Sequence, residues 1–330
     1  MQKRPLGSDG LKVGAVGLGC MSFAGFYGAT DITESHATLA KAMDLGVDFL
    51  DTSNVYGAGK SEEIIGAFIK DHPNFFKIAT KGGIKREPGA TERTFDNSED
   101  YLRGELEKSL KRLGVEHVEL YYIHRQDQTR PVEEVVETLV KCKKEGKIGG
   151  FGFSEIAPTT LRRAHAVHPV MAVQSEYSLW TRMPELGMVQ ACQELGVTFV
   201  PFSPVGRGIF SQKPLDPATF KDTDFRKNNP RFVEPNFSFN MKALEPFNAM
   251  AADKGVTPAT LAIAWVLAQD GDMVPIPGTR SAGHLQECAE ADAMNLTASD
   301  LAEIEKILPV GFAHGARYTH NQLWGTAVYG

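Results

Sequence analysis

The chain has 330 residues, of which 42% are hydrophobic and 23% charged, and its formal net charge at pH 7 is -6. This length can form a sizeable core, while the mild acidity and the absence of a long basic run argue against nucleic acid as the main partner. No segment is apolar for long enough to cross a membrane, and the first residues lack the apolar core of a signal peptide, so we expect a cytoplasmic protein without membrane contact.

Short apolar runs alternate along the chain with segments of helical periodicity. A hairpin turn at residues 6–11 comes first and is expected to plug the bottom of a barrel. The runs that follow are flanked by Gly, Pro or Asp, as strands buried on both faces are. They cover residues 15–18, 47–51, 76–80, 118–124, 149–154, 171–176, 197–202 and 273–277.

Helical periodicity is clearest at residues 35–45, 101–113 and 133–144, and the last of these ends in Lys-Glu-Gly, a helix stop. The apolar spacing predicts the buried face of each of the first two helices. For the first helix the face is His36, Leu39, Ala40 and Met43, and for the second it is Leu102, Leu106, Ser109, Leu110 and Leu113.

Eight strands with seven or more intervening helices predict an α/β fold, a closed (β/α)8 TIM barrel, and an open doubly wound sheet is the alternative. No linker rich in Gly, Ser or Pro divides the chain, so we expect one domain over residues 1–330, with residues 309–330 as a C-terminal tail.

Two segments add to this plan. Residues 206–240 are rich in Pro, Asn, Phe and charge, and a loop of that length is usually a lid or a binding loop. The tail is too aromatic for a routine disordered end, and its ring-bearing residues are His314, Tyr318, His320, Trp324 and Tyr329.

The four cysteines, Cys20, Cys142, Cys192 and Cys288, are scattered and form no Cys-x-x-Cys pair. This pattern indicates packing thiols in a reducing compartment, with neither a metal site nor a disulfide.

Two glycine-rich strings resemble nucleotide-binding motifs and fail on one residue each. Residues 54–61 end in Gly-Lys-Ser, but Asn54 stands where a phosphate-binding loop requires its first glycine. We interpret this string as a turn and a helix start that Ser61 caps. Residues 17–22 begin like a dinucleotide fingerprint, but Ser22 replaces the third glycine.

Polar residues at the ends of three successive strands are the strongest functional signal. Asp51, Lys81 and His124 end or directly follow the second, third and fourth strands, and Tyr56 lies in the loop after the second. In a barrel, the carboxyl ends of the strands meet at one face, where such enzymes act. Each residue alone could be structural, but all four at one rim point to a site.

These four side chains are the groups needed to protonate a carbonyl oxygen during hydride reduction. A tyrosine hydroxyl, with an ordinary pKa of about 10, is a weak acid near pH 7. A neighbouring lysine ammonium is expected to lower the pKa of Tyr56. Asp51 would hold Lys81 charged, and His124 would donate a hydrogen bond to the carbonyl oxygen, without a metal.

The chain resembles the aldo-keto reductase superfamily, most of all its bacterial and fungal branch similar to pyridoxal reductase. The resemblance runs from about Leu6 to about Leu308. The matching strings are GLG at 17–19, DTSNVYG at 51–57, TKG at 80–82, LYYIHR at 120–125, EGK at 145–147, FSE at 153–155, QSEYSLW at 174–180 and PGTR at 277–280. Several such strings in order are highly specific.

The resemblance implies NADPH/NADP+ bound without a Rossmann domain, and a catalytic tetrad of Asp51, Tyr56, Lys81 and His124 with Tyr56 as general acid. The expected activity is reversible reduction of aldehydes and ketones, small-molecule carbonyl or alcohol substrates being the partners. A monomer or weak homo-oligomer is expected. A non-catalytic NADP(H)-binding module, like the channel-associated members, is the alternative, and an ATPase based on residues 59–61 is a third.

The resemblance also implies how the nicotinamide end is held. Ser154 and Gln174 resemble the pair that binds the carboxamide, and Phe202 stands where an aromatic ring stacks under the nicotinamide. Glu155 stands where much of the superfamily has asparagine; it can accept from the carboxamide amine but cannot donate to its oxygen. Further implied cofactor contacts are Gly19, Met21, Asp51, Ser203, Pro204, Gly206, Arg207 and Gly208, with Arg207 as counter-charge to the pyrophosphate.

At the adenosine end, the resemblance has Gly278, Thr279 and Arg280 meeting the 2′-phosphate. The charge of Arg280 favours NADP over NAD, although it could simply be a solvated arginine at a helix start. His284, Glu287 and Cys288 follow in the implied site. His284 replaces the arginine or glutamine, and Cys288 the asparagine, often found there.

The substrate pocket is expected to be walled by Met21, Phe23, Tyr27, Trp180 and the 206–240 loop, with Tyr56 and His124 at its base. This aromatic wall favours flat or apolar carbonyl compounds such as aromatic aldehydes and diketones over phosphorylated sugars, although Arg125 and Arg182 could approach the rim. Alternatively the aromatic residues, Phe23 above all, only pack the loops.

Overall fold

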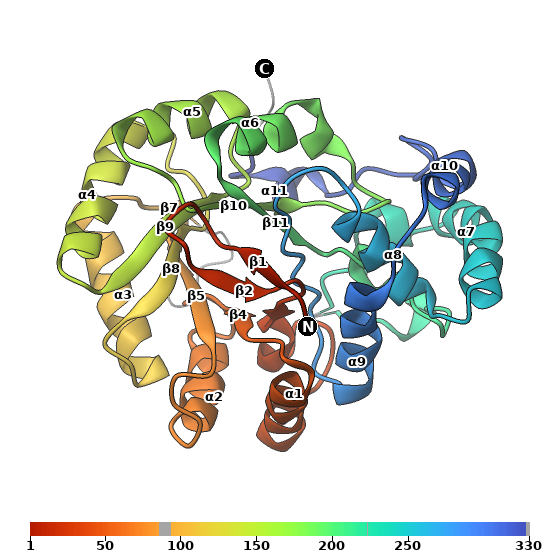
Figure 1. Cartoon of the computed structure of the whole chain (residues 1–330), viewed down its shortest axis with the longest axis horizontal. Coiled ribbons are helices and arrows are strands. Elements are labelled where there is room, and N and C mark those ends of the chain that lie inside the picture. The colour runs from red at the N-terminus through yellow and green to blue at the C-terminus, as the bar shows by residue number, and fades with distance from the viewer. Residues whose placement is uncertain (86–93, 223, 328–330) are drawn as a thin grey trace.

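Seven parallel strands form one curved sheet in the computed structural model, which describes residues 1–85, 94–222 and 224–327 (Figure 1). Their order across the sheet is β11-β10-β9-β8-β5-β4-β3. In chain order the strands are β3 (Leu18–Gly19), β4 (Phe49–Asp51), β5 (Lys77–Gly82), β8 (Val118–Ile123), β9 (Ile148–Ser154), β10 (Ala172–Glu176) and β11 (Thr198–Phe202).

Residues 272–278 close the sheet into a barrel by joining its two outer strands. Gly17 and Gly19, at β3, donate backbone hydrogen bonds to Pro275 and Pro277 (2.9 and 3.0 Å). The isolated parallel bridges are Phe199 with Met273, Phe202 with Ile276 and Gly19 with Gly278. The (β/α)8 prediction is confirmed, but the predicted eighth strand is only a set of bridges, because proline has no N–H to complete a ladder.

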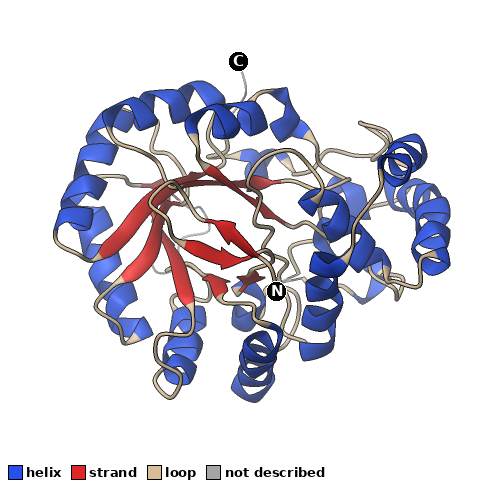
Figure 2. Cartoon of the chain, in the orientation of Figure 1, coloured by secondary structure: helices blue, strands red, loops and turns tan. Residues whose placement is uncertain are grey.

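Helices surround this barrel, as Figure 2 shows. They are α1 (Ile32–Leu45), α2 (Lys60–Ile69), α3 (Glu99–Leu113), α4 (Val132–Lys144), α5 (Pro158–Val167), α6 (Met188–Leu195), α7 (Asn236–Asp253), α8 (Pro258–Leu267), α9 (Ala282–Glu290), α10 (Ala298–Ile307) and α11 (His320–Leu323). Short 3-10 helices are η1 (Met21–Ala24), η2 (Met183–Leu186), η3 (Gly206–Gly208), η4 (Pro217–Thr219), η5 (Pro230–Phe232) and η6 (Ala291–Ala293).

The predicted buried face is right for α3 and only partly right for α1, where Leu39 is buried and His36 and Met43 are partly buried. All five residues predicted for α3 are buried. In α1 the buried residues are Ser35, Thr38, Leu39 and Ala42, whereas Ala40 is exposed. The two hydroxyls can face inward because each has a carbonyl partner: Ser35 donates to the Asp31 oxygen (2.9 Å) and Thr38 to the Arg280 oxygen (2.6 Å).

The predicted plug is confirmed as an antiparallel hairpin of β1 (Lys3–Pro5) and β2 (Lys12–Gly14). Gly14 donates its N–H to Asp48 (2.7 Å), directly before β4, so the hairpin lies at the amino ends of the strands. Leu6 in its turn is fully buried against the barrel interior with Phe49 and Leu120. The opposite end of the barrel, where the strands finish, carries the residues predicted to form the site and is called the active face below.

A second hairpin and the cysteines complete the framework. β6 (Ile84–Lys85) and β7 (Thr94–Phe95) pair antiparallel after β5. All four cysteines are free and buried, as packing thiols would be. Among the helices of the described residues, none combines the length and the apolar character that crossing a bilayer requires.

The 206–240 segment and the tail both cover the active face. The segment is less loop-like than predicted, because it holds three 3-10 turns and α7 already begins at Asn236. Its rings Phe210, Phe220 and Phe232 are buried. The tail docks through Tyr318, which is also buried, and in Figure 1 α11 lies behind the barrel, away from the hairpin. Tyr329 falls outside the described residues.

Candidate active site

Strand ends bring the four predicted catalytic side chains together. Lys81, at the end of β5, directs its ammonium at the Asp51 carboxylate on β4 and donates to the Thr52 carbonyl (2.8 Å). The same ammonium lies 3.4 Å from the Tyr56 hydroxyl. His124, directly after β8, meets Tyr56 edge to face, with ring centroids 5.8 Å apart. One cation therefore links the acid to the phenol, with the imidazole beside them.

Burial and charge pairing have opposite effects on the pKa values of Lys81 and Asp51. The Lys81 side chain is fully buried and that of Asp51 is 3% exposed. Burial lowers the pKa of Lys81, but Asp51 and Tyr56 outweigh it and the net pKa is raised. Burial raises the pKa of Asp51 despite the opposing effect of Lys81. The lysine therefore stays an ammonium at neutral pH.

Lys81 lowers the pKa of Tyr56, as expected, but the net pKa of the phenol is raised. Burial raises the pKa of the phenol, and the nearby Lys81 ammonium only partly counteracts it. Removing water penalises the phenolate more than one cation at 3.4 Å stabilises it. Tyr56 consequently holds its proton at neutral pH, which is the form that a proton donor needs.

Two further side chains form hydrogen bonds with members of the tetrad, one with Asp51 and one with His124. Gln174 on β10, predicted to hold the carboxamide, donates its amide to the second carboxylate oxygen of Asp51 (2.7 Å). Ser53, which sequence reasoning missed, lies with its hydroxyl 3.0 Å from His124 Nδ1. In the tautomer where Nδ1 accepts from Ser53, the Nε2 nitrogen carries the proton. Ser53 lies between Asp51 and Tyr56 in the matched 51–57 string, and this position is the sequence signal that could have identified it.

The rim next to His124 holds a buried arginine. Arg125 donates to the His124 carbonyl (2.6 Å) and to the hydroxyl of Ser154 (3.0 Å), the second residue predicted for the carboxamide. Arg182, the other arginine expected near the rim, instead pairs with Glu185 and Glu305. Of the two arginines expected at the rim, Arg125 is the one that contacts a predicted catalytic residue, His124.

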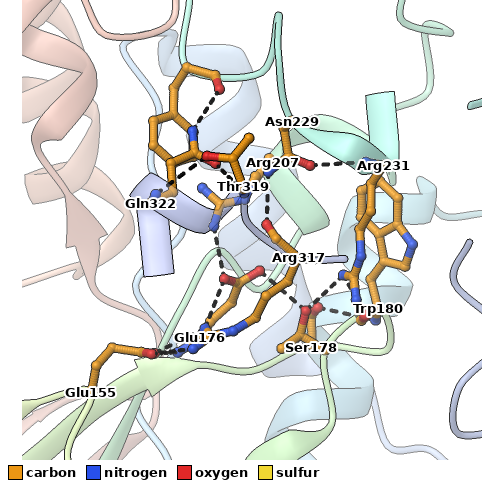
Figure 3. Close-up of polar contacts among 12 residues, drawn as sticks. Glu155, Glu176, Ser178, Trp180, Arg207, Asn229, Arg231, Arg317, Thr319 and Gln322 are labelled. Atoms are coloured by element: carbon orange, nitrogen blue, oxygen red, sulfur yellow. Dashed lines mark hydrogen bonds and ion pairs between the residues drawn. The ribbon is translucent and has the colours of Figure 1, made fainter. Parts of the chain in front are cut away.

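Glu155 does not present a free carboxylate to the carboxamide position, contrary to the sequence-based expectation. Arg317 from the tail binds both of its oxygens, at 3.3 and 2.5 Å, and the Glu176 backbone N–H donates to it at 2.8 Å. Figure 3 shows these polar contacts. Arg317 is 162 residues away in sequence, and no local pattern signalled it.

Arg207 is likewise engaged within the protein. Its guanidinium pairs with Glu176 at the end of β10 (2.8 Å) and lies against the rings of Phe225 and Tyr318 (4.8 and 4.9 Å). Its side chain is 6% exposed. The Arg207 guanidinium is thus already paired with a carboxylate, and its role as counter-charge to a pyrophosphate stays a prediction.

The backbone around Arg207 has an unusual shape after β11. Ser203, Gly206, Arg207 and Gly208 all have left-handed φ values, of 52°, 56°, 59° and 93°. Two of these residues, Ser203 and Arg207, are not glycine. Left-handed φ values are uncommon in such residues and cluster at functional sites. Phe202, directly before, is half-buried at the end of β11.

The turn before α9, which continues the segment bridged to the end of β11, holds the predicted phosphate contacts. Gly278 is exposed, Thr279 is buried, and Arg280 is partly exposed, with its guanidinium 3.3 Å from Glu34 and donating to the Tyr27 carbonyl (3.2 Å). Helix α9 follows with Ser281 as its N-cap. An arginine beside a helix N-terminus is a donor set suited to a phosphate.

The other predicted adenosine contacts lie on α9 and differ in exposure. His284 is exposed and Glu287 is partly buried on α9. Cys288 faces inward against Val16 and Ile263, where burial raises the pKa of its thiol to about 12. The structure does not bring Cys288 to an accessible surface.

The predicted substrate wall divides into two kinds of residue. Met21 and Tyr27 are partly exposed on the segment after β3. Phe23 is fully buried in the main core, so the structure supports the loop-packing alternative for it. Trp180 is 4% exposed, with the Arg231 guanidinium 5.1 Å from its ring. Trp180 therefore backs the wall rather than forming its surface.

Sequence comparison assigns most of the chain to one known family. The family model described as Aldo/keto reductase family matches residues 15–309. A probable aldo-keto reductase 1 from Glycine max is 41% identical, over 96% of this chain and 92% of that protein. An aldo-keto reductase from Schizosaccharomyces pombe, yakc [NADP(+)], is 38% identical, over 96% of this chain and 94% of that protein.

Solved structures agree with this match. A glycerol dehydrogenase from Gluconobacter oxydans superposes with a TM-score of 0.85 at 27% identity, over 93% of this chain and 94% of that one. An aldo-keto reductase from Bacillus halodurans gives a TM-score of 0.77 at 24% identity, over 98% and 99% of the two chains. The second likeness carries the fold alone.

Proposed function

Because the chain belongs to the aldo/keto reductase family, we propose that this oxidoreductase reduces aldehydes and ketones to alcohols with NADPH, reversibly, and that Tyr56 is the general acid. The observation that carries the proposal is the position of the Lys81 ammonium, bound to Asp51 and 3.4 Å from the Tyr56 hydroxyl. This arrangement leaves a protonated phenol beside a fixed cation.

The donor groups fit a dinucleotide phosphate. Arg280 and the N-terminus of α9 suit a terminal phosphate, and the left-handed backbone from Ser203 to Gly208 can offer N–H groups to the pyrophosphate. A Cβ on Gly19 would lie 3.0 Å from the Ile276 carbonyl oxygen, so β3 and the 272–278 segment approach each other closely at the barrel mouth. NADPH, when bound, supplies the hydride that the carbonyl carbon receives.

The protein's own groups handle the proton and the developing charge. Tyr56 gives its hydroxyl proton to the carbonyl oxygen as that oxygen becomes an alkoxide. Lys81 stabilises the resulting phenolate, and Asp51 keeps Lys81 charged and oriented. His124 donates from Nε2 to the same oxygen in the tautomer that Ser53 supports. In the reverse direction Tyr56 recovers the proton from the alcohol.

The proposed substrates are flat or apolar carbonyl compounds, such as aromatic aldehydes and diketones. Partly exposed Met21 and Tyr27, on the segment after β3, offer apolar surface, and the described residues place no cluster of free arginines beside the tetrad. Phosphorylated sugars should therefore be poor substrates.

Mixing the protein with NADPH and nitrobenzaldehyde, while the NADPH absorbance is followed, tests the proposal. The expected result is a decrease that needs both compounds. Tight NADPH binding without turnover, across several aldehydes and in both directions, would instead identify a non-catalytic nucleotide-binding module.

Loss of Arg280 is expected to weaken NADPH binding selectively. By analogy with truncated buried charge pairs, Arg280→Met should cost roughly 2–4 kcal/mol, or about 30- to 1,000-fold in Kd, because the 2′-phosphate loses its cation. NADH affinity should change little. Titration of both cofactors measures the difference, and Glu34→Gln, which removes the competing carboxylate 3.3 Å away, is the control. Equal losses for both cofactors would assign Arg280 to the helix start.

Replacing Trp180 is expected to alter substrate preference. Trp180→Ala removes the ring under Arg231 and lets the 229–232 segment shift toward the pocket. The ranking of carbonyl substrates by kcat/KM should change while NADPH affinity stays within a few-fold. Trp180→Phe keeps an aromatic ring and should retain the original ranking. A uniform loss for every substrate would make Trp180 a scaffold residue.

A further inference from the structure

We propose that Arg317, in the C-terminal tail, is a positioning residue for the cofactor, and that the tail is thereby part of the cofactor site. The proposal rests on the proposed NADPH-dependent reduction. It arises from an ion cluster at the ends of β9 and β10, which consists of Glu155, Glu176, Arg207 and Arg317 (Figure 3).

The two carboxylates of this ion cluster require two arginines. The side chains of Glu155 and Glu176 are 2% and 3% exposed; Glu155 directly follows β9, and Glu176 ends the neighbouring strand β10. Arg207 reaches Glu176 (2.8 Å), and Arg317 binds Glu155 (2.5 Å) and also approaches Glu176 (3.3 Å). In the described residues, Arg317 is the sole ion-pair partner of Glu155. A buried carboxylate that loses its only cation is strongly destabilised.

The pKa values follow from the same arrangement. Burial alone would raise the pKa of Glu176, but Arg207 and Arg317 hold it below its usual range. Burial lowers the pKa of Arg317, but Glu155 and Glu176 raise it more. Glu176 and Arg317 are therefore both charged at neutral pH, so their ionic contact holds the tail at the end of β10 under those conditions.

Arg317 is itself held in one orientation. Its carbonyl oxygen accepts from the Asn229 amide (2.7 Å), and the Tyr318 ring lies 4.7 Å from its guanidinium. The same ring lies 4.9 Å from the Arg207 guanidinium. Tyr318 therefore spaces the two arginines, and the tail, the 206–240 segment and the barrel meet at this point.

Glu155 transmits this contact to the proposed nicotinamide end. Its φ is 56°, a left-handed conformation that costs free energy in a residue with a side chain. The Arg317 ion pair and a hydrogen bond from the Ala327 N–H to the Glu155 carbonyl (2.8 Å) hold it there. Ser154, proposed to bind the carboxamide, is the preceding residue, so release of Glu155 moves it directly.

Glu176 transmits the contact to the proposed pyrophosphate end. It anchors Arg207, whose own φ of 59° belongs to the left-handed backbone from Ser203 to Gly208. Without Arg317, Glu176 keeps its ion pair with Arg207 but loses a second cation, and Glu155 loses its ion-pair partner. Both ends of the cofactor site therefore depend on one side chain of the tail.

The test compares Arg317→Met, Arg317→Lys and a matched surface control, Arg163→Met. Arg163 also pairs with a glutamate, Glu133, but is 59% exposed, so its loss should leave the cofactor site unchanged. NADPH Kd is measured by fluorescence titration, with kcat, KM for aldehyde and melting temperature recorded alongside.

We expect Arg317→Met to raise the NADPH Kd about 30-fold or more, as for truncated buried charge pairs. The KM for aldehyde at saturating NADPH should change far less. Arg317→Lys should recover part of the affinity. Wild-type NADPH affinity in folded Arg317→Met would overturn the positioning role, and so would equal losses in NADPH affinity and aldehyde KM.

If Arg317→Met does not fold, the double variant Glu155→Gln/Arg317→Met replaces it, because it leaves no unpaired charge at Glu155. Weakened NADPH binding by that folded variant supports the proposal, and normal binding overturns it. Failure of the unmodified protein to bind NADPH would instead overturn the proposed function, and is recognised because it needs no variant.

Discussion

Replacing Tyr56 with phenylalanine is expected to lower the turnover of carbonyl reduction by about two to four orders of magnitude, the usual contribution of a general acid. The substitution keeps the ring that meets His124 and removes only the hydroxyl next to Lys81. NADPH affinity should stay within a few-fold. Steady-state kinetics with nitrobenzaldehyde and a separate NADPH titration measure the two effects.

A matched control for this variant is Tyr101→Phe. Tyr101 also carries a hydrogen-bonded hydroxyl, donated to the Ile84 carbonyl (2.9 Å), but it lies on α3 outside the tetrad. Its loss should leave turnover near that of the unmodified protein. Near-normal turnover by Tyr56→Phe would remove Tyr56 from the mechanism.

Replacing Lys81 with methionine is expected to abolish most activity and to destabilise the fold by about 3–5 kcal/mol, since it leaves Asp51 as an unpaired buried charge. The double variant Asp51→Asn/Lys81→Met should recover much of that stability without recovering turnover. Denaturant unfolding and kinetics on the same samples separate the two roles. Full activity in either variant would contradict the proposed coupling.

The pH dependence of this variant has a defined sign. Lys81 lowers the pKa of Tyr56, so its loss should move the alkaline limit of any residual reduction to higher pH. The folded-state pKa of Lys81 is raised, so its contribution to stability is present below an unfolded pKa of about 10.4 and is lost as the pH rises through the folded value. An unshifted alkaline limit in Lys81→Met would count against the coupling.

The tetrad could be predicted because its geometry follows from strand ends. Asp51 lies opposite Ala79 in the β4–β5 register, so Lys81, two residues on, points to the same face and past the end of β4. Burial of the set was not predictable from spacing, and it outweighs the expected lowering of the Tyr56 pKa by Lys81. The local sequence pattern therefore identified the four residues, whereas their protonation states depend on how deeply the surrounding packing buries them.

Other predictions failed where a contact depends on distant residues. Ser61 was expected to cap α2, but Gly59 is the N-cap, and Ser61 instead donates to the Cys20 carbonyl (2.9 Å). Arg207 and Glu155 were related to the cofactor through the family resemblance, yet each has an ion-pair partner from another part of the chain. Such partners leave no periodic signal in one sequence.

The way residues 272–278 seal the barrel also bears on how the protein is made. They bridge strands that come from near the start and from the middle of the chain, so β3 keeps an unpaired edge until most of the polypeptide has left the ribosome. Ring closure over so long a loop is entropically costly and slow, and it leaves a template for intermolecular pairing meanwhile. We therefore expect nascent chains truncated before residue 272 to aggregate or to require chaperones, and synthesis of the last residues to coincide with the gain of solubility.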